Sequence, residues 1–108
     1  MRVLLDENMP HQLRAHLPEH EVSTAVYAGF GGFKNGKLLK ATEDAGYGVL
    51  LTGDLSLEYQ QNLTGRKISI VVLGNSQWPV VRLYLDLVAA AVDAATPGSY
   101  AEVKIPFR

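Results

Sequence analysis

Short apolar runs recur along the chain, and each is bounded by polar residues or glycine. Residues 3–5, 47–52 and 68–73 are almost continuously apolar, a pattern typical of strands that are buried on both faces of a parallel sheet. Residues 20–27 instead alternate apolar with polar positions, which predicts an edge strand or a strand with one exposed face. Residues 101–105 are expected to form a last short strand.

Between the predicted strands, apolar residues recur at the three- and four-residue intervals of a helix. We expect a short helix after Pro10, a second from an N-cap at Asn35 to a left-handed Gly46, and a third over residues 56–63. The longest helix is expected over residues 79–95. Strands that alternate with helices predict an α/β fold with a parallel sheet and right-handed crossovers.

The longest predicted helix is apolar around much of its circumference. One side carries Val80, Leu83, Leu87 and Ala91, and a second stripe carries Val81, Leu85 and Val88. Together with Trp78 and Tyr84, this surface is larger than one face of a sheet needs. Because contiguous apolar patches usually mark interfaces, we expect a homodimer or a tight protein partner.

Length and composition fit one domain that spans residues 1–108. Apolar residues make up 47% of the chain, and the formal net charge of −1 gives no overall attraction to nucleic acid or to an anionic membrane. Cysteine is absent, which excludes thiolate metal sites and suits a reducing cytoplasm. No apolar run reaches the roughly 18–20 residues of a membrane span, and Asp6 and Glu7 interrupt the one that would begin a signal peptide. We therefore expect a cytoplasmic protein without membrane contact.

Polar residues that could carry chemistry follow two of the predicted strands directly. Asp6, Glu7 and Asn8 come after the first strand, and Thr52 and Asp54 come after the third. In open α/β sheets, ligands bind outside the carboxyl ends of the strands. The sequence therefore predicts a functional site at this edge of the sheet.

Asp6 and Asp54 are expected to face each other, because neighbouring parallel strands are about 4.8 Å apart. Two carboxylates about 5 Å apart repel by about 3 kcal/mol at an effective dielectric constant of about 20. A divalent cation, a lysine or protonation of one acid would offset this repulsion. Either residue could also serve only as a helix cap or a turn residue, so the pattern leaves the role of the pair open.

The segments Asp6-Glu7-Asn8-Met9-Pro10 and Thr52-Gly53-Asp54 resemble motifs of the PIN-like superfamily. The likeness is to the short bacterial PIN-like proteins that open with Asp-Glu-Asn-x-Pro, and it runs from Met1 to about Leu73. Lys34-Asn35-Gly36 and residues 60–63 also resemble features of a subgroup. The resemblance implies a three-layer α/β/α sandwich with a central, mainly parallel sheet. For active relatives it implies RNA cleavage that depends on Mg²⁺ or Mn²⁺, often by the toxin of a toxin–antitoxin pair.

The resemblance also implies roles for individual residues. Asp6 and Asp54 match the acids that hold the metal ion, and Glu7 or Asn35 would orient metal-bound water. Lys37 or Arg66 would hold the RNA backbone. The other polar residues expected to contact substrate are Asn8, Thr52, Gln60, Gln61 and Asn62.

One position departs from the pattern of active relatives. Many of them carry an acid where the loop meets the second helix, and this chain has Asn35 there. Glu43 lies about 12 Å further along the helix and is a poor substitute. Two functions therefore remain. The first is a metal-dependent ribonuclease, of the kind paired with an antitoxin, and the second is a decayed PIN-like module that binds a protein or RNA.

The remaining polar side chains are expected to be solvated unless the fold gathers them. Three histidines lack a spacing that pairs well with the acids and are predicted to lie on the surface: His11, His16 and His20. The amide cluster at residues 60–62 either faces solvent or donates hydrogen bonds to phosphate or base edges. A modest basic set would steer a phosphate backbone if it surrounds the acidic edge, namely Lys34, Lys37, Lys40 and Arg66.

Overall fold

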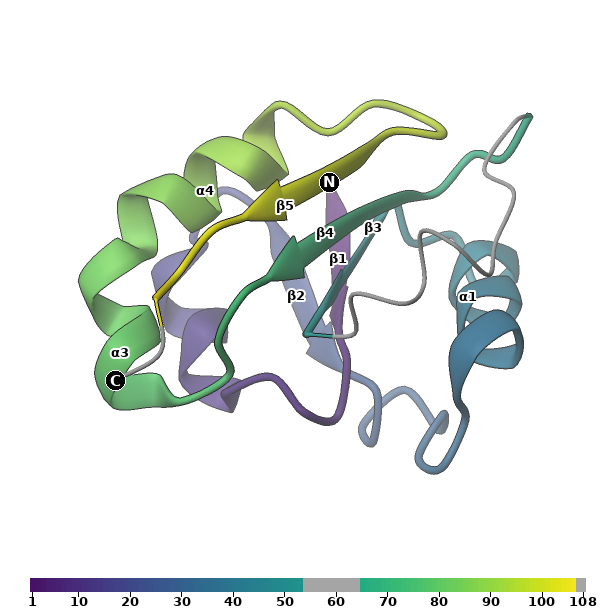
Figure 1. Ribbon diagram of the computed structural model, residues 1–108. Helices are drawn as coiled ribbons and strands as arrows, with labels where there is room; N and C mark the ends of the chain where they lie inside the picture. The colour runs from purple at the N-terminus through teal and green to yellow at the C-terminus, as the bar shows by residue number, and fades with distance from the viewer. Residues whose placement is uncertain (54–64, 107–108) are drawn as a thin grey trace.

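The computed structural model describes residues 1–53 and 65–106 and shows one five-stranded sheet in which every pairing is parallel (Figure 1). The strand order is β2-β1-β3-β4-β5. The predicted α/β fold with a parallel sheet is confirmed. The strands are β1 (Arg2–Leu5), β2 (Glu21–Thr24), β3 (Val49–Thr52), β4 (Ser69–Leu73) and β5 (Tyr100–Val103).

The strand order places β1 at the point where the chain changes direction across the sheet. From β1 the chain goes first to β2 on one side, and it then returns to β3 on the other side. In doubly wound sheets, this switch leaves a crevice between the carboxyl ends of the two strands, because their following connections cover opposite faces. The register pairs Leu5 with Leu51, so the residues after β1 and β3 meet at this crevice.

Helical segments cover both faces of the sheet, as Figure 1 shows with α1 on one side and α3 and α4 on the other. On one face, Leu38 and Leu39 of α1 (Asn35–Asp44) pack on Leu4 and Leu50. On the other face, the odd-numbered strand positions Val3, Leu5, Val49 and Leu51 contact the 3-10 helix η1 (His11–His16) and the helical segment 78–93. Strands buried on both faces explain why their sequences are apolar without alternation.

The edge strand β2 is shorter than the alternating pattern predicts. It ends at Thr24, where a hydrogen bond from the Ala28 N–H to the Thr24 carbonyl oxygen begins a turn. Val26 and Tyr27 lie in this turn and are 65% and 84% exposed. The alternation of apolar and polar residues continues into this turn. The alternation alone therefore could not locate the end of β2.

The start and end of α1 follow the sequence signals to within one residue. Lys34 is the N-cap residue, and Asn35 is the first residue of the helix rather than its cap. Gly46 has a φ of 88°, which confirms the left-handed position expected after the helix. The helix predicted over residues 56–63 lies outside the described residues.

The prediction of one continuous helix over residues 79–95 is wrong. The structure divides the segment into α3 (Trp78–Val81), the 3-10 turn η2 (Arg82–Tyr84) and α4 (Leu85–Asp93). The buried residues are Val80, Val81, Val88 and Val92, whereas Leu83 and Leu87 are 57% and 52% exposed. The tighter turn at η2 changes the direction of the side chains, so the second stripe faces the sheet, whereas Leu83 and Leu87 of the first stripe face solvent. No helix in the described ranges is long and apolar enough to cross a membrane.

Candidate functional site

Asp6 stands directly after β1, at the switch point of the sheet. Its N–H donates to the Leu51 carbonyl oxygen at 2.9 Å, which extends the pairing with β3 by one residue. On the other side, the Ala25 N–H donates to the Leu5 carbonyl oxygen at 2.8 Å. The backbone that carries Asp6 is therefore fixed from both neighbouring strands, and its half-buried side chain leaves the sheet at the crevice.

The carboxylate of Asp6 is held by two short hydrogen bonds. Its Oδ1 accepts from the Glu7 N–H at 2.7 Å, and its Oδ2 accepts from the Thr52 hydroxyl at 2.7 Å. Thr52 is the fully buried last residue of β3. Hydrogen bonds to an ionised acceptor are strong, so the two donors set the orientation of the carboxylate. Within residues 1–53 and 65–106, no cation pairs with it.

Glu7 and Asn8 connect the turn after β1 to other segments. The Gly32 N–H donates to Oε1 of Glu7, which ties the glycine-rich loop before α1 to the acidic turn. The Gly53 N–H points at Oδ1 of Asn8 at 3.4 Å, a long contact. A Cβ on Gly53 would lie 3.0 Å from Cε of Met9. Glycine at this position therefore lets the ends of β1 and β3 approach closely.

The other residues predicted for this site fall into three groups. Lys37 lies in the first turn of α1, next to the loop that Glu7 contacts, and its ammonium is 4.2 Å from the centroid of the Phe33 ring. Arg66 precedes β4 at the opposite edge, where its guanidinium pairs with the Glu43 carboxylate at 3.0 Å, so the structure does not bring it together with Asp6. Outside the described residues lie Asp54, Gln60, Gln61 and Asn62.

In the part of the chain that the structure describes, no three Asp, Glu or His side chains come together as a metal-binding group. Magnesium requires fewer protein ligands, because it keeps several waters and binds through one or two carboxylates. Each oxygen of the Asp6 carboxylate accepts one hydrogen bond from the described residues, whereas an ionised carboxylate offers about four lone-pair sites. Asp6 therefore has the chemistry and the remaining capacity for a hydrated divalent cation.

A cavity of about 360 Å³ adjoins the acidic turn. Asp6 and Glu7 line it on one side, His11 and Gln12 of η1 on another, and Thr24 and Val26 at the end of β2. A phosphate group in this cavity would lie beside the Asp6 carboxylate. Two acidic side chains in the lining require that a cation accompany such a ligand.

Comparison with protein-family models, with curated proteins and with solved structures found no match. The resemblance to PIN-like proteins is thus carried by the residues of this chain alone and stays a prediction.

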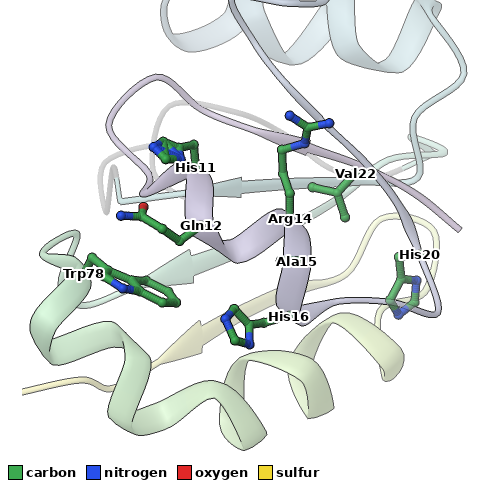
Figure 2. A pocket seen from close by; sticks show the side chains of 8 residues that line it. All are labelled: His11, Gln12, Arg14, Ala15, His16, His20, Val22 and Trp78. Carbon is green, nitrogen blue, oxygen red and sulfur yellow. The ribbon is translucent and has the colours of Figure 1, made fainter.

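A second and larger hollow, of about 690 Å³, lies over η1 and was not predicted from the sequence. Figure 2 shows His11, Gln12, Trp78 and His16 following one another along one side of η1, with Arg14 projecting from the other side next to Val22. The rings of His16 and Trp78 are 5.4 Å apart between centroids. The prediction that the histidines are only surface residues missed this arrangement, because it depends on the packing of η1 against α3.

His20 lies at the far end of the larger hollow and is mostly buried. Its Nε2 contacts Oδ1 of Asp93 at 2.6 Å, which ties the start of β2 to the end of α4. Its Nδ1 is buried without a hydrogen-bond partner. A buried polar atom without a partner costs about 1–3 kcal/mol.

Proposed function

We propose that this chain is a metal-dependent ribonuclease of PIN-like type, with its site at the carboxyl ends of β1 and β3. The observation that carries the proposal is the Asp6 carboxylate, which is oriented by two hydrogen bonds at the switch point and has no described counter-charge. The helices on both faces of the sheet are consistent with the three-layer α/β/α sandwich of PIN-like proteins.

Asp6 is the described residue that would hold the cation, and Asp54 is the second ligand predicted from the sequence. The bound cation would polarise the phosphate and lower the pKa of a coordinated water. Thr52 and the Glu7 N–H keep the Asp6 carboxylate in one orientation before substrate arrives. Preorganised groups of this kind avoid the cost of reorganisation during the reaction.

Glu7 and Lys37 would position the substrate rather than the cation. The bond between Glu7 and the Gly32 N–H holds the loop that leads into α1 against the acidic turn. Lys37 lies one turn into α1 and packs on Phe33 of that loop. Its ammonium is therefore available near the site for a phosphate of the RNA backbone. Arg66 is not part of this arrangement, because it pairs with Glu43 at the other edge.

The test is cleavage of a labelled single-stranded RNA by purified protein in the presence of Mn²⁺. Wild type should cleave, and Asp6→Asn should reduce the rate at least about 100-fold, because it removes the proposed metal ligand. Asp54→Asn should do the same. Asp44→Asn is the matched control, since Asp44 is an exposed acid at the far end of α1 that pairs with Lys40. Cleavage that survives Asp6→Asn or an excess of EDTA would overturn the proposal.

A binding module without catalysis is the second candidate, and one observation favours it. No described third acid joins Asp6 and Glu7 at the edge, and α1 begins with Asn35. The same experiment separates the two functions. RNA binding that is independent of Mn²⁺, with no cleavage by wild type, would support the binding module and reject the ribonuclease.

A further inference from the structure

The hollow over η1 adjoins the cavity at the acidic turn, because two residues of η1 belong to both linings. His11 and Gln12 line both of them. In Figure 2, His11 lies at one end of the row of side chains, and Trp78 and His16 lie further along it. A chain-like ligand that passes Asp6 would therefore meet His11 and Gln12 next, and after them the rest of the hollow.

The lining of the hollow combines aromatic rings with nitrogen donors and contains no carboxylate. His16 and Trp78 form a tilted pair with an interplanar angle of 36°. Trp78 packs partly against the apolar core, so its ring is held in place. Within the described residues, the side chain of Arg14 has neither a hydrogen bond nor an ion pair. Asp93, which lies next to His20 at one end of this surface, is engaged by the His20 ring.

These features match one class of ligand better than others. Aromatic side chains that stack on successive bases, together with cationic groups along the backbone, are the general means of binding single-stranded nucleic acid. The cavity volume of about 690 Å³ lies in the range of sites for small ligands, about 300–1,000 Å³. Its open side, and the residues that it shares with the cavity at the acidic turn, indicate a segment of a longer chain rather than an enclosed small molecule.

We propose that the hollow over η1 binds a short segment of single-stranded RNA, with one base stacked on Trp78, a phosphate near His11, and a further phosphate of the strand near Arg14 on the other side of η1. The strand then passes Gln12 and reaches Asp6. The subsite rests on the proposed ribonuclease function for its role, because it would hold the substrate on one side of the cleavage site.

Trp78 is the only tryptophan in the chain, so its fluorescence reports directly on the subsite. The probe is an oligoadenylate of about eight nucleotides, a length within the range of single-strand sites, titrated in EDTA so that no cleavage occurs. The oligonucleotide should quench Trp78, and inorganic phosphate should not, because quenching requires a stacked base. Fluorescence anisotropy of a labelled oligonucleotide measures total binding in parallel.

Three variants test the assigned roles. Trp78→Ala should raise Kd by about 5- to 100-fold, the effect of losing one stacking platform, and Trp78→Phe should restore most of the affinity. Arg14→Ala should reduce the slope of log K against log salt by about 0.7, the effect of losing one phosphate contact. Because Trp78 packs on the core, the exposed Arg14 keeps the test valid if Trp78→Ala does not fold. Lys67→Ala is the matched control for charge, because Lys67 is exposed at the opposite edge of the sheet.

Binding of the oligonucleotide without quenching of Trp78, or with no effect of Arg14→Ala on the salt slope, would place the RNA elsewhere and overturn the subsite. Absence of any binding would also overturn it. In the same titration, Asp6→Asn should quench as wild type does, because Asp6 is not part of the hollow. Comparison of quenching with the cleavage assay then separates the two proposals. Quenching without cleavage by wild type would reject the ribonuclease and keep the subsite, whereas cleavage without quenching would reject the subsite alone.

Discussion

Charged residues have different partners at the two ends of the parallel strands, which are called here the amino edge and the carboxyl edge of the sheet. At the amino ends of the strands, charges meet partners of opposite sign or aromatic rings. Arg2 donates to the Ala45 carbonyl oxygen at 2.7 Å and lies 4.2 Å from the centroid of Tyr47. Arg66 pairs with Glu43 at 3.0 Å, and the Lys67 N–H donates to the same carboxylate at 2.8 Å.

At the carboxyl ends, the acids meet only neutral donors. Asp6 accepts from a hydroxyl and a backbone N–H, and Glu7 accepts from a backbone N–H. None of the ion pairs that the structure describes includes either acid. An edge with internal charge pairs holds the fold together, whereas an edge with oriented but uncompensated carboxylates is suited to an external cation. Charged residues at the ends of strands can thus have a structural or a functional role. The presence or absence of a counter-charge distinguishes the two roles.

The largest effect on stability is expected at the amino edge. Glu43→Ala should lower the free energy of unfolding by about 2–3 kcal/mol, because it removes the acceptor for both the half-buried Arg66 guanidinium and the Lys67 N–H. Urea denaturation measures this change. Asp44→Ala is the control, since Asp44 makes only an exposed pair with Lys40 and should cost less than about 0.5 kcal/mol. Equal effects of the two variants would show that the pairing at this edge is not structural.

The carboxyl edge should respond to a cation instead. With a Kd of about 1 mM, Mn²⁺ at about 10 mM should stabilise wild type by about 1.4 kcal/mol. This stabilisation raises the melting temperature by about 5–10 °C for a domain of this size. Asp6→Asn should abolish the response, whereas Asp44→Asn should keep it. Thermal unfolding with and without Mn²⁺ decides the matter, and a shift that is equal in Asp6→Asn and wild type would indicate general screening.

Thr52→Val should separate orientation of the carboxylate from its charge. It removes the hydroxyl that donates to Asp6 and nearly preserves the volume of the buried side chain, so the free energy of unfolding should fall by about 1 kcal/mol. The cleavage rate should fall about 10-fold, as for other residues that orient a metal ligand. Thr42→Val is the matched control, because the buried Thr42 hydroxyl donates to the Leu38 carbonyl oxygen within α1. If both variants lower cleavage equally, the Thr52 bond has no role beyond stability.

Much of the fold could be predicted because burial on both faces leaves a direct mark on the sequence. The apolar runs at residues 47–52 and 68–73 locate β3 and β4 to within two residues, and the alternation of strands with helices gives their parallel pairing. The break at η2 could not be predicted, because a continuous apolar segment fits a straight helix equally well. Tyr84, with φ of −124°, departs from the helix there without glycine or proline to signal it.

The acidic edge could be predicted in part for the same reason. Asp6 follows β1 and Thr52 ends β3, two strands that proved to be neighbours, and parallel strands end at one edge. Arg66 was assigned to this edge although it precedes its strand, and the topology places it at the other. The hollow over η1 could not be predicted, because His16 and Trp78 are far apart in sequence and meet only through the packing of η1 on α3.

The smallest effect on stability is expected from the exposed leucines outside both edges. Leu83 lies in η2 and Leu87 in α4, four residues further along, and they are 57% and 52% exposed. The homodimer predicted from the sequence would bury them, since contiguous exposed apolar groups favour association. The double substitution of Leu83→Ser and Leu87→Ser should convert a dimer to a monomer in light scattering. The free energy of unfolding of the monomer should change by less than about 0.5 kcal/mol per site, as is usual for exposed positions.

The two exposed pairs of apolar residues make this test specific. Val26 and Tyr27 are also exposed, at 65% and 84%, but they lie in the turn after β2 beside the acidic cavity. Val26→Ser with Tyr27→Ser removes apolar area of similar kind without touching the helical segment, so it should leave the dimer intact. If both double variants dissociate the dimer equally, the contact is not confined to the helix surface. Wild type that scatters light as a monomer at high concentration would show instead that Leu83 and Leu87 are solvated, and that the acidic edge and the hollow over η1 act within a single copy of the chain.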